Sequence, residues 1–434
     1  MRITRVSPKN GSFELEIDKI ATDKSISHRC AIFSLLAQKP SRIRGFLRGE
    51  DTLNTLKIAQ KLGLDVASEG DSLILTPPRN GIIEPDDVLD CGNAGTAMRL
   101  YTGLLSAIKG YFVLSGDSYL RKRPMRRIVD PLRSIGAKIF GRDGGELAPL
   151  SIIGAPLRSF DYASPIASAQ VKSALILAAM HGESPSYFSE PELSRDHTER
   201  MLQGMGAAIT AKEGKITITP RSKLSPLELT IPADPSSAFF FAVAAAITPG
   251  AKVFLKNVLL NPTRIEGFRA LERMGAKIGY QITSQTYESI GDIEVAHASL
   301  RGINVTKRLS WLIDELPALS IAMALAEGKS CVQNAKELRA KESDRISVVV
   351  ENLQKLGIEA IELDDGYEIT GGEFKATQTL ESHGDHRIAM SFALVGLCVP
   401  VEILDTDCMD VSFPNFLHIL AQMAKVEHES QARG

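Results

Sequence analysis

The sequence is poor in the features that mark several common classes of protein. It has one tryptophan and five cysteines among 434 residues, and the cysteines are scattered without a CxxC pair. This scatter argues against a disulfide framework and a zinc site, and it favours free thiols in a reducing compartment. No apolar run approaches the roughly 18 residues of a membrane span, and the first residues lack the apolar core of a signal peptide. We therefore expect a cytoplasmic protein with no membrane segment and no metal ion.

Charge of one sign is also missing. The chain has 50 Lys and Arg against 52 Asp and Glu, a net charge of −2, with 44% hydrophobic and 24% charged residues. Such a balance is typical of a folded globular protein, and it argues against a nucleic-acid binder, which would show a basic excess. The usual glycine-rich nucleotide-binding loops are absent too. Small anions remain candidate ligands because they need only a local cluster of cations.

A repeat of about 72 residues runs through the chain. Four apolar segments end at Gly110, Gly182, Gly250 and Gly328, which are 72, 68 and 78 residues apart, and segments 29–37 and 387–397 extend the series to six. Between them, shorter helical patterns close on a glycine, the usual helix stop. Each repeat reads helix, strand, helix, strand, strand in cyclic order, which predicts an α/β fold. The first helix is apolar nearly all round, so we expect sheets wrapped around buried helices.

Cations gather where these apolar helices begin. A cation near a helix N-terminus opposes the helix dipole, so Lys24, Arg29, Arg99 and Arg387 indicate that anions bind there. Capping explains Asp234, which precedes a proline. Capping is also the simpler interpretation of the Ser194–Glu199 segment, as an exposed loop is for Arg126 and Arg127. Further cations lie in the segments 121–127 and 339–345.

Two carboxylates, Asp314 and Glu342, lie among the cations at helix starts. Burial would raise the pKa of either group and a nearby arginine would lower it, so the sequence leaves the direction open. Acids in an anion site have little use in binding alone. They therefore favour acid–base catalysis.

Together these motifs resemble the 5-enolpyruvylshikimate-3-phosphate (EPSP) synthase family. The resemblance covers residues 23 to about 415 and is specific because the motifs occur in the family's order. It rests on Lys24-Ser25-x-Ser27-x-Arg29, on Gly92–Arg99, on Arg123-Pro124-Met125, on Arg339–Arg345 and on Asp385–Met390. The segments 168–172, 195–199 and 261–264 are similar to the class II branch of the family.

The resemblance implies a two-domain inverse α/β barrel with six βαβαββ repeats, three in each domain. Residues 22–233 would form one domain, and residues 1–21 with 234–434 the other. The active site would lie in the cleft between them. The resemblance also implies a monomer that needs no cofactor.

The implied reaction transfers the enolpyruvyl group of phosphoenolpyruvate to the 5-hydroxyl of shikimate 3-phosphate and releases phosphate. Asp314 would be the base for the hydroxyl and Glu342 the acid at C3, with Lys24 as an alternative proton carrier. The residues implied for shikimate 3-phosphate are Ser25, Arg29, Ser168, Ala169, Gln170, Arg195 and Lys341. Those implied for phosphoenolpyruvate are Lys24, Asn93, Gly95, Arg123, Arg345 and Arg387, with Gln170 between the substrates and His386 at the phosphate end.

The sequence departs from the family at three places that bear on the site. Val411 stands where many relatives have a lysine that contacts phosphoenolpyruvate, and Glu337 stands where many have an asparagine. Gly95 leaves room for the herbicide glyphosate, whereas the class II motifs favour tolerance.

Two other functions compete with this interpretation. The first is a UDP-N-acetylglucosamine enolpyruvyl transferase, which shares the fold. The absence of cysteine from 120–125 and the Lys24-Ser25 pair argue against it. The second is a non-catalytic anion-binding protein on the same fold, against which Asp314 and Glu342 argue.

Overall fold

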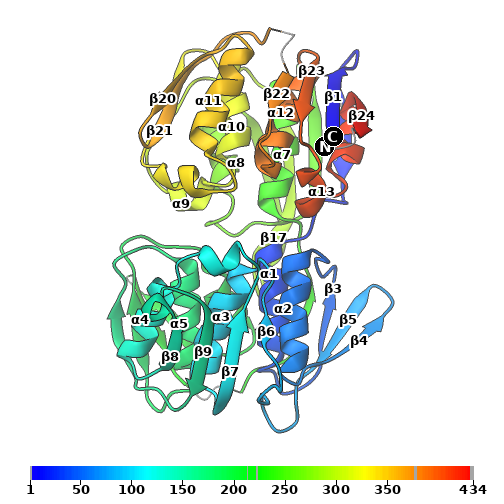
Figure 1. Cartoon of the computed structure of the whole chain (residues 1–434). Helices are drawn as coiled ribbons and strands as arrows, with labels where there is room; N and C mark the ends of the chain where they lie inside the picture. The colour runs from blue at the N-terminus through cyan, green and yellow to red at the C-terminus, as the bar shows by residue number, and fades with distance from the viewer. Residues whose placement is uncertain (1, 213, 221–222, 376–378, 431–434) are drawn as a thin grey trace. The chain divides into compact units, whose positions relative to one another are not determined.

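The computed structural model describes residues 2–212, 214–220, 223–375 and 379–430. Its strands form six four-stranded sheets, and the chain divides into two compact units (Figure 1). Unit 1 holds residues 1–21, 232–285 and 289–434, and unit 2 holds residues 22–231 and 286–288. The domain predicted from the sequence for residues 22–233 did not include the three-residue segment 286–288, which belongs to unit 2.

Each sheet has the same design, which confirms the six predicted repeats. In the repeat that begins at β6 (Leu89–Asp90), the first strand is parallel to β7 (Gly110–Ser115), and β9 (Leu147–Gly154) pairs antiparallel with both β7 and β8 (Lys138–Arg142). Helices α3 (Gly95–Ser106) and α4 (Arg126–Ser134) connect the strands. The parallel pair needs a helical crossover, and the antiparallel pair needs only a turn.

The other elements of unit 2 follow this order. Its sheets β14-β3-β5-β4 and β10-β11-β13-β12 have the same strand arrangement as the first. The elements are α1 (Lys24–Ser34), β3 (Ser41–Arg44), α2 (Glu50–Lys61), β4 (Asp65–Glu69), β5 (Ser72–Thr76), β10 (Asp161–Ala163), α5 (Ala169–Ala179), β11 (Ser186–Ser189), α6 (His197–Gly204), β12 (Ile209–Lys212), β13 (Lys215–Ile218) and β14 (Glu228–Thr230), with 3-10 turns at η1 (Leu120–Lys122) and η2 (Asp143–Gly145).

Unit 1 contains the other three sheets, and no helix in the described part of the chain is long and apolar enough to cross a membrane. Its elements are β1 (Arg2–Pro8), β2 (Glu14–Ile17), α7 (Pro235–Ile247), β15 (Lys252–Leu259), α8 (Glu266–Arg273), β16 (Lys277–Ser284), β17 (Ile290–Ala296), β18 (Asn304–Val305), α9 (Leu309–Leu312), α10 (Leu316–Ala324), β19 (Lys329–Val332), η3 (Lys336–Ala340), α11 (Arg345–Lys355), β20 (Glu359–Leu363), β21 (Gly366–Thr370), β22 (Thr379–Glu381), α12 (His386–Ala393), η4 (Leu394–Leu397), β23 (Val401–Leu404), α13 (Cys408–Ser412), α14 (Phe416–Met423) and β24 (Ala424–Ser430).

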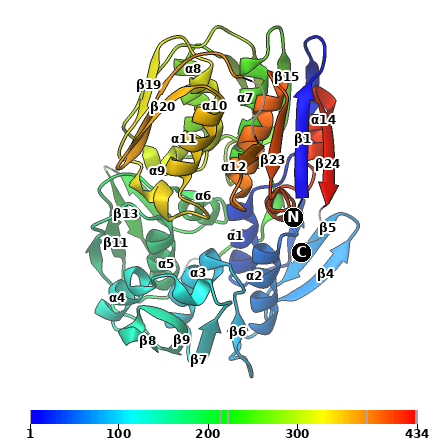
Figure 2. The same ribbon diagram turned by 45° about the horizontal axis from the view of Figure 1, so that its top comes forward.

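Two repeats are completed by strands from distant parts of the chain. β2 precedes α1 in sequence but pairs with β15, and β14 precedes α7 but pairs with β3. The chain thus passes from unit 1 to unit 2 just after β2, and from unit 2 to unit 1 just after β14. A third strand is displaced as well: β1 lies between β23 and β24, so the first and last strands are neighbours (Figure 2).

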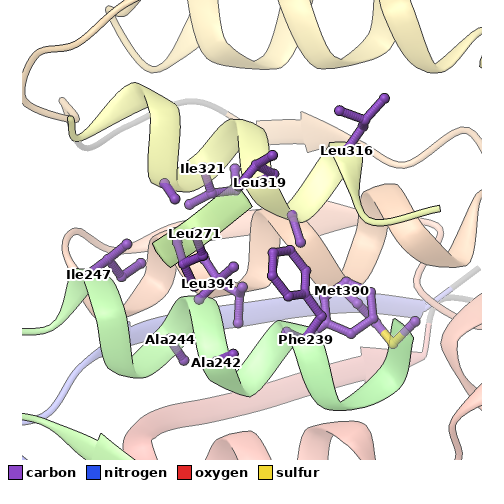
Figure 3. Close-up of a cluster of buried hydrophobic side chains, with 14 of the residues drawn as sticks. Phe239, Ala242, Ala244, Ile247, Leu271, Leu316, Leu319, Ile321, Met390 and Leu394 are labelled. Carbon is purple, nitrogen blue, oxygen red and sulfur yellow. The ribbon is translucent and has the colours of Figure 1, made fainter. Parts of the chain in front are cut away.

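The inner helices are buried on nearly every side, as their composition predicts. In α7 and α10 almost every side chain is buried, and side chains of α7, α8, α10 and α12 pack together in the interior of unit 1 (Figure 3). In unit 2, α3 and α5 approach so closely that a Cβ on Gly103 would lie 2.3 Å from the Ala174 carbonyl oxygen. Burying these helices leaves mainly their first turns to carry polar groups.

Candidate active site

In unit 2, helix α1 carries an exposed lysine, Lys24, and a buried arginine, Arg29. Asp23 caps the helix by accepting from Ile26 N at 2.8 Å, and the Lys24 ammonium pairs with Asp51 of α2. Arg29 is buried, and it donates to Thr198 Oγ1 at 2.8 Å and to Ser173 Oγ at 3.1 Å. Burial lowers the pKa of Arg29 to about 10, so the guanidinium is still charged at neutral pH.

The start of α3 holds a second set of polar groups. The Asn93 amide donates to Asp117 Oδ2 at 2.9 Å, and its oxygen accepts from Arg123 Nη2 at 2.6 Å. Gly95 begins the helix, where an added Cβ would lie 3.0 Å from Arg99 Nη1 and 3.3 Å from Arg123 Nη1. The missing side chain therefore lets two guanidinium groups lie beside the helix N-terminus.

Gln170, in the first turn of α5, accepts hydrogen bonds from two arginines. Its Oε1 accepts from Arg99 at 2.7 Å and from Arg127 at 3.3 Å, and its amide nitrogen donates to Thr96 Oγ1 at 3.2 Å. Burial, with Arg127 and then Arg123, lowers the pKa of Arg99 to about 9. Arg127 therefore contacts a site residue, although the sequence indicated only an exposed loop.

Four more residues that are expected to bind shikimate 3-phosphate lie at or just before helix starts in unit 2. Ser168 caps α5 by accepting from Val171 N at 3.5 Å, and Ala169 is the first helical residue. Arg195 lies just before α6, and Ser25 is the second residue of α1, where its carbonyl accepts from Arg29 Nη1 at 3.0 Å. The capping box expected for 194–199 does not form, because the residue that precedes α6 is Asp196 and its side chain makes no capping hydrogen bond. Ser194 Oγ donates to Glu190 Oε1 at 3.1 Å.

In unit 1, Arg345 is the centre of a network of carboxylates. It is 1% exposed, and it donates to Asp385 Oδ2 at 2.8 Å and to Glu342 Oε2 at 2.6 Å. Its Nη1 lies 3.8 Å from Asp314 Oδ1. Arg387 also reaches Asp314, donating to its carbonyl oxygen at 3.1 Å with its Nε 3.9 Å from Oδ1. Both proposed acid–base carboxylates thus share one guanidinium.

The charges of this network set the protonation states of Glu342 and His386. Burial tends to raise the pKa of Glu342, but Arg345 and then His386 outweigh it, so the pKa is lower than usual. Burial and Arg387 lower the pKa of His386 to about 4. Without substrate at neutral pH, Glu342 is therefore a carboxylate and His386 a neutral imidazole.

Two positions left open by the sequence have different outcomes. Glu337 forms an ion pair with Lys341, with Oε1 and Nζ 2.7 Å apart, so it orients a proposed substrate-binding lysine. Val411 is in α13, but its side chain lies outside the described residues.

Several residues that hold the expected site residues in place were given no role by the sequence analysis. Asp385 is fully buried, accepts from Arg345 and Ser343, and caps α12 through the backbone N–H of Arg387. Asp51 and Asp117 hold Lys24 and Asn93 in the same way. Only Asp385 gave a signal, as an aspartate just before a helix that begins with two basic residues.

Six similar sheets around buried helices, with cations at the helix starts, define a two-unit α/β protein suited to small anions. A family model described as EPSP synthase (3-phosphoshikimate 1-carboxyvinyltransferase) matches residues 9–420. The chain belongs to this family.

Relatives and solved structures agree with this assignment. The chain is 69% identical over 434 residues to the 3-phosphoshikimate 1-carboxyvinyltransferase of Wolinella succinogenes, covering 99% of each chain. It is 56% identical to that of Helicobacter hepaticus, covering all of both chains. The solved EPSP synthase from Acinetobacter baumannii superposes with a TM-score of 0.92 at 38% identity, over 99% of this chain and 100% of that one.

Proposed function

We propose that this protein catalyses the reaction for which its family is named, with Asp314 and Glu342 as its acid–base groups. It transfers the enolpyruvyl group of phosphoenolpyruvate to the 5-hydroxyl of shikimate 3-phosphate. The observation that carries the proposal is the pair of carboxylates tied to Arg345 in a chain of this family. A simple anion-binding site would be weakened by such acids.

The reaction proceeds by addition and elimination. The 5-hydroxyl oxygen attacks C2 of phosphoenolpyruvate while its proton passes to a base and C3 gains a proton. The tetrahedral intermediate then loses phosphate and a C3 proton, so the double bond returns. Proton transfer and charge neutralisation are sufficient to make C2 electrophilic.

The binding roles are divided by substrate. Shikimate 3-phosphate binds to Ser25, Arg29, Ser168, Ala169, Gln170, Arg195 and Lys341. Phosphoenolpyruvate binds to Lys24, Asn93, Gly95, Arg123, Gln170, Arg345 and Arg387, with His386 beside its phosphate. Buried arginines suit this work because they remain charged and give bidentate hydrogen bonds to phosphate and carboxylate.

Asp314 takes the hydroxyl proton, and Glu342 gives a proton to C3. Glu342 must first be protonated, although Arg345 holds its pKa low in the free protein. A substrate anion at Arg345 neutralises that guanidinium and so raises the pKa of Glu342. Lys24 is the alternative proton carrier, and its Nζ pairs with Asp51.

Phosphate release tests the proposal. Purified protein receives both substrates, then each one alone, without added metal. Release that requires both substrates supports the transfer. If folded protein releases none, the proposal is wrong, and UDP-N-acetylglucosamine is tried as acceptor. Binding of shikimate 3-phosphate without turnover on either acceptor would indicate an anion-binding protein.

We also propose that the protein acts in the cytoplasm. All five cysteines are free thiols, and Cys30 and Cys91 are buried. Free thiols are usual in a reducing compartment. Fractionation of cells would test this placement.

A further inference from the structure

A single buried ammonium group in unit 2 binds one segment of the chain three times. Lys172 of α5 is fully buried, and its Nζ lies 2.8 Å from Glu190 Oε1, 2.9 Å from Glu199 Oε1 and 3.2 Å from the Ser194 carbonyl oxygen. A lysine ammonium has three protons to donate. All three of these acceptors lie between β11 and the first turn of α6, so this segment takes the full donor capacity of Lys172.

Stability alone does not explain this arrangement. Lys172 lies in the first turn of α5, where a cation opposes the helix dipole, and the side chains of Glu190 and Glu199 are only 5% exposed. Buried ion pairs of this kind are often no more stabilising than apolar side chains of similar volume. The neighbouring inner helices of the unit are apolar, so a methionine at 172 with neutral partners would suit the interior.

The three hydrogen bonds fix the backbone beside Arg195. Glu190 Oε1 also accepts from Ser194 N at 2.9 Å, while Lys172 holds the Ser194 carbonyl. Ser194 is thus held at both its N–H and its C=O. The peptide group that joins Ser194 to Arg195 is therefore oriented by the buried Lys172 ammonium.

One of these carboxylates, that of Glu199, also offsets the repulsion between Arg29 and Arg195. Arg195 lowers the pKa of buried Arg29, whereas Glu199 raises it. Arg29 is in turn bound to Thr198, the neighbour of Glu199 in α6. The Arg29 side chain and the backbone that carries Arg195 are therefore held in place before an anion arrives, which reduces the ordering cost of binding.

We propose that Lys172, with Glu190 and Glu199, is a positioning group that holds Arg195 for the phosphate of shikimate 3-phosphate. This inference rests on the proposed function. Lys172 touches no substrate. It acts through Arg195, so its removal weakens binding of the phosphorylated acceptor while the chemistry and the binding of phosphoenolpyruvate change little.

A double-mutant cycle tests the proposal with the full chain. The dissociation constant of shikimate 3-phosphate is measured by calorimetry for the wild type, Lys172→Met, Arg195→Ala and the double variant. We expect Lys172→Met to raise it about 10- to 100-fold. In the Arg195→Ala background the same change should add less than about threefold. A role confined to folding would instead give additive effects in both backgrounds and overturn the proposal.

Steady-state kinetics provide a second readout. For Lys172→Met, the KM for shikimate 3-phosphate should rise while kcat and the KM for phosphoenolpyruvate stay within about threefold. Lys172→Arg, which keeps the charge and donors, should recover part of the affinity. Lys215→Met is the matched control, because Lys215 forms an exposed ion pair with Asp161 in the same unit. It should leave the dissociation constant unchanged.

Folding of each variant is checked by circular dichroism. If Lys172→Met does not fold, Glu190→Gln replaces it in the cycle, since its amide keeps an acceptor oxygen but loses the charge that holds Lys172. An unchanged dissociation constant in the folded variant overturns the inference. Wild-type protein that fails to bind shikimate 3-phosphate would overturn the proposed function instead, whereas active wild type without coupling in the cycle would overturn only the positioning role.

Discussion

Arg345 is the side chain to which both proposed acid–base carboxylates are tied. Glu342 Oε2 lies 2.6 Å from its Nη2, and Asp314 Oδ1 lies 3.8 Å from its Nη1. The guanidinium orients both carboxylates. It also holds the pKa of Glu342 low, so Glu342 cannot act as an acid until an anion shares the guanidinium.

Removing the base should stop the reaction without unfolding the protein. Asp314→Asn keeps the size of the side chain but cannot accept the hydroxyl proton, so kcat for phosphate release should fall about 10²- to 10⁴-fold. Glu359→Gln, at an exposed position of β20, is the control and should leave kcat unchanged. A kcat for Asp314→Asn within about tenfold of wild type would rule out the assigned base.

Binding of phosphoenolpyruvate should be accompanied by proton uptake. The pKa of Glu342 is held low by Arg345, and that of His386 is lowered to about 4 by burial and Arg387. An anion that neutralises these arginines raises both pKa values, so protons bind as the anion binds, and the contribution of His386 is largest just above pH 4. Calorimetry in buffers of different ionisation enthalpy measures the uptake.

The contribution of Glu342 can be separated from that of His386. In Glu342→Gln the uptake should shrink, and the remainder belongs to the imidazole. Proton release on binding, or uptake that is unaffected by the substitution, would contradict this account of how Glu342 becomes an acid.

The sequence predicted the residues of these networks better than their connections. Lys24, Arg29 and Arg387 were found because cations at helix starts are unusual. The roles of Asp385 and Asp51 were missed because an aspartate looks like a cap or a surface charge until the fold brings an arginine or lysine to it. The role of Glu337 could not be predicted, because its ion pair with Lys341 is visible only in the fold.

At the scale of elements, the close approach of α3 and α5 has a clear energetic consequence. A Cβ on Gly103 would lie 2.3 Å from the Ala174 carbonyl oxygen, so Gly103→Ala must push the helices apart. Overpacking of this kind costs roughly 1–3 kcal/mol of unfolding free energy, although alanine is otherwise the better helix former. Urea denaturation should therefore show a lower midpoint.

Gly372→Ala is the control for this substitution. A Cβ there would meet its nearest atom, Ile358 Cδ1, at 3.6 Å, which is ordinary contact. Its urea midpoint should match that of wild type. A Gly103→Ala variant as stable as wild type would show that α3 and α5 can separate freely.

Elements were the scale at which the sequence was most informative. Apolar helices such as Ala238–Ile247 could be recognised as buried, because no face of them is polar. The partners of short strands could not be predicted, since β2 and β14 pair with strands far along the chain and nothing in their few residues specifies which.

At the scale of the whole molecule, the two ends of the chain are partners. β1 and β24 pair from Arg2 opposite Ser430 to Pro8 opposite Ala424. A permuted chain that joins residue 430 to residue 2 through a short linker and opens between Gly70 and Asp71, in the exposed β4–β5 turn, should therefore keep its phosphate-release activity within a few-fold.

A second permutant opened between Tyr287 and Glu288 provides the contrast. Glu288 is buried in unit 2, where its Oε1 lies 2.6 Å from His197 Nδ1, and a new chain end there would break this pair. We expect a lower melting temperature and weaker binding of shikimate 3-phosphate, because His197 follows Arg195 closely. Equal behaviour of the two permutants would contradict this role of the segment 286–288. No pattern in the sequence indicated this segment, because it lies in a loop between the strands β16 and β17.

Because β1 lies between β23 and β24, it cannot pair within its sheet until those later strands have been synthesised. Its partners emerge from the ribosome roughly 400 residues later, a wait of about 20–80 s at 5–20 residues per second. During that time β1 has two free edges that other nascent chains can join. Arg2 and Arg5 charge this strand and so discourage such pairing. Translation that stops before residue 401 leaves β1 without either neighbour, so this sheet is completed only after residues 401–430 have been synthesised.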